Sequence, residues 1–311
     1  RPGVAHVQRA SSSPEFQSSR SGYAPRKKLC YTRAWNHLAK VCLRHGRRRQ
    51  VLGARRSKGS RMKGAGEIVV QSTDQQRLYQ ELGEIAQGLM PKYGRYWYRH
   101  SVATMGVATL NRILHYHELY KKILDVPGVI CEFGVQWGAT MSQLVALRTL
   151  YEPFNRSREI FGFDTFEGFP SVDGKDGAAV AVGDYSSAEN YQASLEKILT
   201  IHESLAPLPQ IKKFGLIKGD ASETIGPWLE SHKYAIISMA IFDMDLYKPT
   251  KDVLEQILPR LTKGSLLVFD ELNCPQFPGE TLALDEVLGL NRLTLKRSIY
   301  EPYCSWAVFE G

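Results

Sequence analysis

The sequence predicts an α/β fold in which helices cover both faces of a mostly parallel β-sheet. Short apolar runs alternate with amphipathic helical stretches from about residue 128 to residue 289, the pattern of a parallel sheet that is buried on both faces. The first two runs are joined by a helical stretch and form a βαβ unit with glycines at its first turn. A last pair of strand-like segments predicts an antiparallel hairpin at one edge of the sheet.

Two helical stretches precede the sheet, and we expect residues 67–127 to form a helical cover over a ligand site. The first stretch spans residues 74–90 and should end at Pro91, and the second spans about residues 107–124. The Trp-Tyr-Arg-His segment at 97–100 is expected to be a loop between them. Two interpretations of it remain open, a packed aromatic joint and a lid that faces the substrate.

The alternation that follows predicts one domain over residues 128–311. Strands are expected near residues 128–133, 159–164, 214–218, 235–242 and 264–269. Helices are expected near residues 139–151, 187–204, 222–231, 249–260 and 280–289. The closing hairpin would join residues 293–299 to residues 305–309 through Glu301-Pro302.

The net charge of +8 divides unevenly along the chain. Residues 1–66 carry 17 Lys and Arg against a single acid, Glu15, a net charge of +16 that leaves −8 for the remainder. An acidic body argues against a protein that binds nucleic acid over its whole surface. The basic segment, with few apolar repeats, is expected to be a disordered tail.

Three interpretations of this basic segment remain open. It resembles a transit peptide in being rich in Arg and Ser and poor in acids. It also has the composition of a basic arm that contacts nucleic acid or an acidic membrane. A third interpretation is that it is not native, since the chain starts with Arg1 and its first methionine is Met62.

Cysteine spacing and hydropathy indicate the cellular compartment that we expect. The five cysteines lie at positions 30, 42, 131, 274 and 304 and show no Cys-x-x-Cys pattern. This usage favours a reducing compartment and argues against a structural zinc site. No apolar run reaches the roughly 18 residues that a membrane-spanning helix needs. We therefore expect a cytoplasmic protein without a membrane span.

The βαβ unit carries the strongest functional motif. Its first strand ends in Glu132-Phe-Gly-Val-Gln-Trp-Gly138, and its second ends in Asp164, 30 residues after Gly134. Glycines at the first turn allow close backbone approach to a ligand, and the acid can accept hydrogen bonds from ribose hydroxyls. The pattern therefore indicates an adenosyl cofactor. The alternative is that Gly134 and Gly138 are ordinary turn and packing glycines.

The spacing favours S-adenosylmethionine (SAM) over a dinucleotide. A dinucleotide site needs Gly-x-Gly-x-x-Gly so that its pyrophosphate can lie on the helix N-terminus. Glu132 would repel that pyrophosphate, whereas a carboxylate suits the ammonium and sulfonium groups of SAM. Asp220, at the end of the third strand, is placed to bind the adenine amino group. It can also cap the following helix, and the two roles are compatible.

Four carboxylates follow the fourth and fifth predicted strands: Asp243, Asp245, Asp270 and Glu271. Unpaired carboxylates that lie together repel each other, and a divalent cation removes that repulsion. Oxygen ligands favour Mg²⁺, which can lower the pKa of a hydroxyl group about to be methylated. The alternative is that these acids cap helices or pair with Lys248 and Lys251.

Four motifs resemble the macrocin O-methyltransferase (TylF-type) family over about residues 75–310. They are Glu132 to Gly138, Phe163-Asp-Thr-Phe-Glu-Gly-Phe-Pro170, Asp243-Met-Asp-Leu-Tyr247 and Asp270-Glu271. The resemblance implies a class I methyltransferase (Rossmann-like) fold, whose sheet usually closes with an antiparallel hairpin. It also implies SAM-dependent and commonly Mg²⁺-dependent methylation of sugar hydroxyls on macrolides and related natural products.

Carried over by position, the resemblance implies roles for individual residues. SAM contacts fall on Glu132, Gly134, Thr140, Asp164 and Asp220, and Gly138 and Ala221 adjoin them as further candidates. Metal ligation falls on Asp243, Asp270 and Glu271. The family usually has Asp-Asp in place of Asp270-Glu271, so the longer side chain can shift or remove one ligand.

The catalytic base is left open by the sequence. Some members of the family are thought to use a histidine after the Asp-Thr-Phe-Glu-Gly motif, but residues 171–191 contain none. Asp245 and Lys248 are the candidates for the base, with Asp243 as the third catalytic residue.

We therefore expect a SAM-dependent, Mg²⁺-assisted O-methyltransferase that acts on a hydroxyl group of a sugar or related small polyol. The alternative is a non-catalytic SAM-fold scaffold whose basic arm binds an acidic partner. Whether the chain forms a homo-oligomer is left open.

Overall fold

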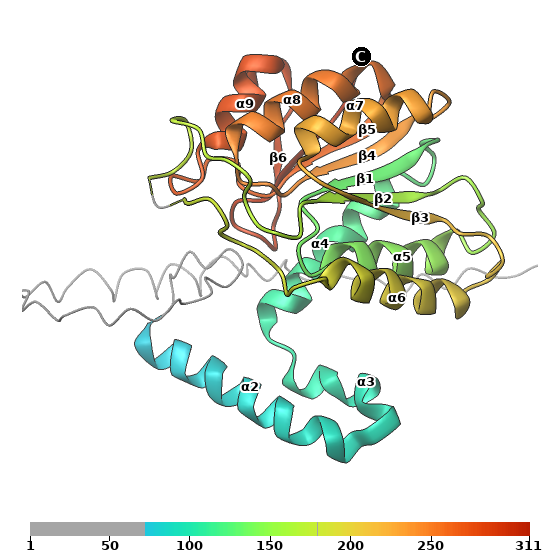
Figure 1. Ribbon diagram of the computed structural model, residues 1–311, viewed down its shortest axis with the longest axis vertical. Coiled ribbons are helices and arrows are strands. Elements are labelled where there is room, and N and C mark those ends of the chain that lie inside the picture. The colour runs from blue at the N-terminus through green and yellow to red at the C-terminus, as the bar shows by residue number, and fades with distance from the viewer. Residues whose placement is uncertain (1–71, 179) are drawn as a thin grey trace, which may run out of the picture. The chain divides into compact units, whose positions relative to one another are not determined.

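The computed structural model describes residues 72–178 and 180–311 of the chain (Figure 1). The chain divides into two units, residues 1–59 and 60–311, and every described residue belongs to the second. The basic segment 1–66 and the first residues of the expected cover lie outside the described residues. No helix in the described part is long and apolar enough to cross a membrane.

A seven-stranded mixed sheet forms the centre of the described unit. Its strand order is β3-β2-β1-β4-β5-β7-β6. The strands are β1 (Val129–Phe133), β2 (Ile160–Asp164), β3 (Phe214–Lys218), β4 (Ile237–Phe242), β5 (Leu261–Phe269), β6 (Lys296–Arg297) and β7 (Ser305–Val308). The first five strands pair in parallel, whereas β7 pairs antiparallel with both β5 and β6. The predicted parallel sheet and its antiparallel closing hairpin are thus confirmed.

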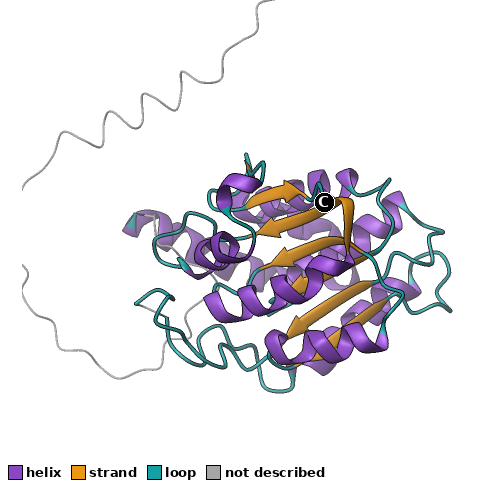
Figure 2. Cartoon of the chain, turned by 90° about the horizontal axis from the view of Figure 1, so that it is seen from above, coloured by secondary structure: helices purple, strands orange, loops and turns teal. Residues whose placement is uncertain are grey.

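Helices cover both faces of the sheet (Figures 1 and 2). On one side lie α4 (Val107–Lys122), α5 (Ala139–Tyr151) and α6 (Tyr191–Ser204). On the other lie α7 (Ala221–Ser231), α8 (Tyr247–Ile257) and α9 (Gly279–Val287). Because side chains alternate between the faces of a strand, each face has its own core. Ile130 joins the core beneath α4, α5 and α6, and its neighbour Cys131 joins the core beneath α7, α8 and α9.

The N-terminal helices differ from the sequence prediction in two respects. Helix α2 spans Thr73–Tyr93 and contains Pro91, which was expected to end it. A proline removes one backbone N–H, and in a helix with no buried residue water can bind the freed carbonyl. Residues Trp97–His100 form the short helix α3 rather than a loop. Trp97 and Tyr98 are 46% and 56% exposed, so they do not form a packed aromatic joint within this unit.

The strand order places a ligand site at one edge of the sheet. Strands β2 and β3 continue from β1 in one direction, and β4 and β5 continue in the other. The carboxyl ends of β1 and β4 therefore meet at a topological switch point, where open parallel sheets bind ligands. The polar motifs of the sequence follow these strands.

Candidate active site

A cavity of about 570 Å³ opens at the carboxyl ends of the parallel strands. Residues that follow all five parallel strands line it, together with α4 and the loop before β7. Its charged lining consists of Arg112 and eight acids, Glu132, Asp164, Asp220, Asp243, Asp245, Asp270, Glu271 and Glu301. The four residues of α3 are not among those that line the cavity.

The glycine loop after β1 is closely packed against neighbouring elements. Gly134 has φ 91°, and a Cβ atom there would lie 1.8 Å from the Asp243 carbonyl oxygen. Gly138 has φ 73°, and its Cβ would lie 2.3 Å from Leu195 Cδ1 of α6. Both positions need glycine for the backbone angle and for space. This packing requirement is separate from any contact with a ligand.

Asp164 orders the same loop. Its Oδ2 accepts the N–H groups of Val135 at 2.6 Å and Gln136 at 2.7 Å, and its Oδ1 accepts the Phe166 N–H at 2.5 Å. Asp164 also lines the cavity. Each carboxylate oxygen has two lone-pair directions, so Oδ1 retains one for a ribose hydroxyl.

The remaining predicted SAM residues also lie at the cavity. Thr140 stands in the first turn of α5, and its hydroxyl accepts a hydrogen bond from Arg112. Asp220 caps α7 by accepting the Ser222 N–H at 2.9 Å, and it lines the cavity with Ala221. Asp220 uses only one carboxylate oxygen to cap α7, so its other oxygen can bind a ligand.

Glu132 presents an unpaired buried carboxylate oxygen to this site. Its side chain is 1% exposed, and Oε2 has no hydrogen-bond partner among the described residues. Burial, with the charge of Asp243 added, raises its pKa well above the usual range. Such a group is costly unless a donor satisfies it. The ammonium group of SAM is a donor of the required charge, so Glu132 fits the predicted ligand.

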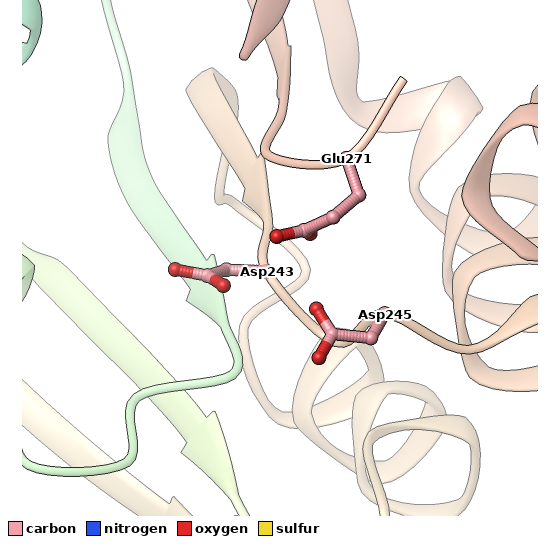
Figure 3. Close-up of side chains that lie close together, drawn as sticks. All are labelled: Asp243, Asp245 and Glu271. Atoms are coloured by element: carbon pink, nitrogen blue, oxygen red, sulfur yellow. The ribbon is translucent and has the colours of Figure 1, made fainter. Parts of the chain in front are cut away.

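Three further carboxylates converge on one point (Figure 3). Ligand oxygens of Asp243, Asp245 and Glu271 all lie within 4.8 Å of one another. Asp243 and Asp245 come from the tip of β4, and Glu271 reaches toward them from the tip of β5. Asp245 has φ 61°, a left-handed conformation that is uncommon for a residue with a side chain and often found at functional sites.

These carboxylates titrate abnormally. Burial and the charge of Asp270 raise the pKa of Asp243 to about 8. Burial raises the pKa of Asp245 to about 6, although its hydrogen bond with Glu271 acts in the opposite direction. Burial and the charges of Asp245 and Asp270 raise the pKa of Glu271 well above its usual range. Glu271 Oε2 is buried and has no hydrogen-bond partner within the described part of the chain. A divalent cation would satisfy these oxygens, so the residues fit a metal.

Asp270, the other predicted metal ligand, pairs with Arg112, which also donates to Asp243 Oδ2 at 2.5 Å. Both of its oxygens accept hydrogen bonds from Arg112 Nη1, at 3.2 and 3.3 Å, and Oδ1 accepts one from the Cys304 thiol at 2.8 Å. Burial alone would raise the pKa of Asp270, but Arg112 and the thiol hold it below the usual range. Asp270 is outside the converging group of three.

The structure does not bring Lys248 to the cavity. Its ammonium pairs with Asp252 one turn along α8, its side chain is 57% exposed, and it is not among the lining residues. Lys251 pairs instead with Glu286 of α9 at 2.5 Å. Of the two candidate bases, only Asp245 is therefore at the site.

Sequence reasoning missed three polar residues that shape the site. Arg112 and Tyr116 project from α4, and Glu280 of α9 accepts the Glu271 N–H at 3.2 Å while remaining fully buried. Arg112 could have been found from the helix pattern. It lies one helical turn before Tyr116 and two turns before Leu119, and both of these residues are buried. Arg112 is therefore a cation on the face of α4 that packs against the sheet.

Comparisons with known proteins agree with this geometry. The chain matches the family described as Macrocin-O-methyltransferase (TylF) over residues 47–283, a match that begins inside the expected tail. It resembles the structure of CalS11, a calicheamicin methyltransferase, with TM-score 0.74 and 33% identity over 83% of this chain and 100% of that one. An apo structure of CalS11, described as a TDP-rhamnose 3'-O-methyltransferase, gives TM-score 0.68 and 34% identity over 78% and 97% of the two chains.

Two curated relatives are more distant. An 8-demethyl-8-(2,3-dimethoxy-alpha-L-rhamnosyl)-tetracenomycin-C 4'-O-methyltransferase of Streptomyces olivaceus is 27% identical over 47% of this chain. Mycinamicin III 3''-O-methyltransferase of Micromonospora griseorubida is 27% identical over 55% of this chain. The matches span 53% and 65% of these relatives' own lengths. The family match covers most of the chain, and the chain belongs to the macrocin O-methyltransferase (TylF) family of SAM-dependent O-methyltransferases.

Proposed function

We propose that this protein transfers the methyl group of SAM to a hydroxyl group of a sugar, either on a glycosylated natural product or on a nucleotide-linked precursor. The observation that carries the proposal is the cavity itself. On its β1 side it presents the Glu132 carboxylate, whose Oε2 has no hydrogen-bond partner among the residues that the structure describes, and on its β4 and β5 side it presents three converging carboxylates. Such a cavity suits a cationic methyl donor beside a polar acceptor.

The donor side is formed by the glycine loop and the tips of β2 and β3. Glu132 would bind the ammonium group, Asp164 a ribose hydroxyl and Asp220 the adenine amino group. The rigid loop between β1 and α5, held by Asp164, would fix the sulfonium in position. Orientation of this kind contributes much of the rate enhancement in transfer reactions between two bound molecules.

The acceptor side would carry Mg²⁺. Asp243, Asp245 and Glu271 are the residues that the described geometry offers to hold it, with Asp270 as the remaining family-implied ligand. A bound Mg²⁺ would supply charge neutralisation and polarise a sugar hydroxyl.

Asp245 is our candidate for the base that removes the hydroxyl proton. It is 7% exposed, lines the cavity and has a pKa raised to about 6 by burial. A base that is ionised at neutral pH but not strongly acidic is suited to accept that proton. Met244, Leu246 and Phe169 line the same cavity and would exclude water from the reacting atoms.

The relatives guide the choice of acceptor. One acts on a rhamnosyl group, and a structural relative is described as acting on TDP-rhamnose. We infer that a deoxyhexose hydroxyl is the acceptor class to test first.

The test supplies labelled SAM with TDP-linked deoxyhexoses, deoxyhexosyl natural products and simple phenols. Labelled sugar product that disappears in EDTA and returns with Mg²⁺ supports both parts of the proposal. Transfer that persists in EDTA would contradict only the metal-assisted part of the proposal. Tight SAM binding with no transfer to any acceptor would favour the scaffold interpretation, which the Asp270-Glu271 variation and the missing histidine motivate. Failure of the folded protein to bind SAM would contradict the proposal altogether.

A further inference from the structure

Helix α8 begins directly after the turn that carries Asp245, yet its own sequence provides no cap. Leu246 stands at the N-cap position, and its side chain makes no capping hydrogen bond. Asp245 is left-handed at φ 61°, and the Leu246 N–H donates to the Met244 carbonyl at 2.7 Å. The first N–H groups of a helix have no partner within the helix, and a left-handed backbone costs free energy at a residue with a side chain. This turn therefore depends on contacts from elsewhere to keep its conformation.

Asp176 supplies the missing cap from the loop after β2. Its Oδ1 accepts the N–H of Tyr247, the first residue of α8, at 2.7 Å, although the two residues are 71 positions apart. Its Oδ2 accepts the Asp173 N–H at 2.7 Å, so the carboxylate bridges two loops. A negative charge at a helix N-terminus is stabilised by the helix dipole. Asp176 thus does for α8 what Asp220 does locally for α7.

Close packing holds Asp176 in this position. A Cβ atom at Gly279, the first residue of α9, would lie 2.6 Å from Asp176 Oδ1 and 2.4 Å from the Tyr247 nitrogen. A Cβ atom at Gly177 would lie 1.8 Å from the Gln276 carbonyl oxygen. The backbone around Asp176 therefore fits against the start of α8 and the residues before α9, with no room for a side chain at either glycine.

A second contact between the same loop and α8 lies at the surface. The Lys175 ammonium lies 3.8 Å from the centroid of the Tyr247 ring and donates to Glu286 Oε2 at 2.9 Å. The Lys175 and Glu286 side chains are 46% and 43% exposed, and ion pairs this exposed contribute little to stability. Lys175 contacts the side chain of Tyr247, whereas Asp176 binds its backbone, so Lys175 provides a matched comparison.

We propose that Asp176 is a positioning residue for methyl transfer. By capping α8 from another loop, it holds the turn between β4 and α8 and keeps Asp245 directed at the acceptor side of the cavity. The inference rests on the proposed role of Asp245 as the base. Asp245 lines the cavity and points toward Asp243 and Glu271 (Figure 3), whereas Asp176 is not among the lining residues. Asp176 therefore acts through the turn and not by touching a substrate.

Kinetics of methyl transfer by the full chain give the first test. Asp176→Ala should lower kcat on the order of 10–100-fold, because a displacement of about 1 Å at a reacting group can cost that much. SAM affinity and the KM of the acceptor should stay within about threefold of the wild type. Asp176→Asn keeps one oxygen for the Tyr247 N–H but places an N–H group against that of Asp173, so its loss of kcat should be only about two- to fivefold. Lys175→Met is the control and should leave kcat within about twofold of the wild type.

Hydrogen–deuterium exchange gives a second measurement that needs no acceptor. In Asp176→Ala the Leu246 and Tyr247 amides should exchange at least about tenfold faster than in the wild type, because the turn opens more often. The Ser222 amide, which Asp220 caps within α7, should exchange as in the wild type. Thermal unfolding of each variant detects a general loss of stability. Should Asp176→Ala fail to fold, Asp176→Asn tests the inference through smaller shifts of kcat and exchange in the same directions.

Three results would overturn the inference. One is unchanged exchange at Leu246 and Tyr247 in Asp176→Ala, and another is faster exchange there with a wild-type kcat. The third is a loss of SAM affinity as large as the loss of kcat, which would indicate general destabilisation. If the wild type transfers no methyl group to any acceptor, the proposed function fails. The exchange measurement then decides by itself whether Asp176 holds the turn: faster exchange supports that role and unchanged exchange overturns it.

Discussion

Asp164 and Gln136 are hydrogen-bonded across the turn that follows β1, where Asp164 Oδ2 accepts the Gln136 N–H at 2.7 Å. Gln136 has φ 47°, a left-handed conformation that costs free energy for a residue with a side chain. The Val135 N–H donates to the same oxygen at 2.6 Å. The carboxylate expected to bind ribose is therefore also the group that holds the donor loop in its conformation.

We predict that Asp164→Asn weakens SAM binding by about 2–3 kcal/mol, because hydrogen bonds to an ionised acceptor are lost on both the loop and the ligand. Isothermal titration calorimetry measures the change. The control is Glu167→Gln, which neutralises an acid in the loop after β2, three residues beyond Asp164, whose side chain is 74% exposed. Equal SAM affinity in Asp164→Asn and the wild type would contradict the role of Asp164.

A glycine substitution tests the packing of the same loop. Gly134→Ala should lower the free energy of unfolding by more than about 2 kcal/mol, because its Cβ would overlap the Asp243 carbonyl and its φ is positive. Gly83→Ala in α2 is the control, since no atom lies within 4 Å of its Cβ. It should be neutral or stabilising by up to about 1 kcal/mol. Urea unfolding measures both, and comparable effects at the two glycines would contradict the prediction.

Much of this site could be predicted from sequence because it follows directly from strand ends. Glu132, Asp164 and Asp220 each stand at the tip of a parallel strand, and parallel strands bring their tips to one edge. The ion pair between Arg112 and Asp270 could not be predicted in this way. The two residues are 158 positions apart, and their pairing depends on how α4 packs on the sheet.

The sequence also could not predict which partner each carboxylate interacts with. The strand pattern placed four acids together but could not show that Asp270 turns to Arg112 while Glu271 turns to Asp245. Lys248 is the opposite case, a residue that the sequence predicts at the site and that the structure places at the surface. It follows the Asp-Leu-Tyr motif closely in sequence, but the first turn of α8 directs it to Asp252 at the surface.

Asp245 can be tested as the base through kinetics. Asp245→Asn should lower kcat by about 10²–10⁴-fold, the usual contribution of a positioned general base. SAM affinity should be unchanged, because the residue lies on the acceptor side. The wild-type rate should fall at acid pH, where the carboxylate is protonated, and a bound cation would place this fall below the pKa of about 6 that burial gives Asp245 without a metal. Asp252→Asn on α8 is the control. A kcat of Asp245→Asn equal to the wild-type value at saturating Mg²⁺ would contradict this assignment.

His115 provides a test of stability against pH. Its side chain on α4 is 3% exposed, and Nε2 has no hydrogen-bond partner among the described residues. Burial lowers its pKa from 6.5 to about 4, and the nearby Arg112 adds to this against the opposing charge of Asp270. Between these two pKa values the unfolded chain takes up a proton that the folded chain does not. The folded state should therefore lose up to about 3 kcal/mol of stability as pH falls from 6.5 toward 4.

We predict that His115→Leu removes this loss while leaving other titrating groups in place. The difference in unfolding free energy between variant and wild type should shift in favour of the variant by about 2 kcal/mol from pH 7 to pH 5, since that interval covers most of the window below 6.5. Urea unfolding at the two pH values measures it. His202→Leu, which removes an exposed histidine from α6, is the control and should keep the wild-type dependence. Parallel stability curves for His115→Leu and the wild type would show that His115 is protonated as readily in the folded as in the unfolded chain.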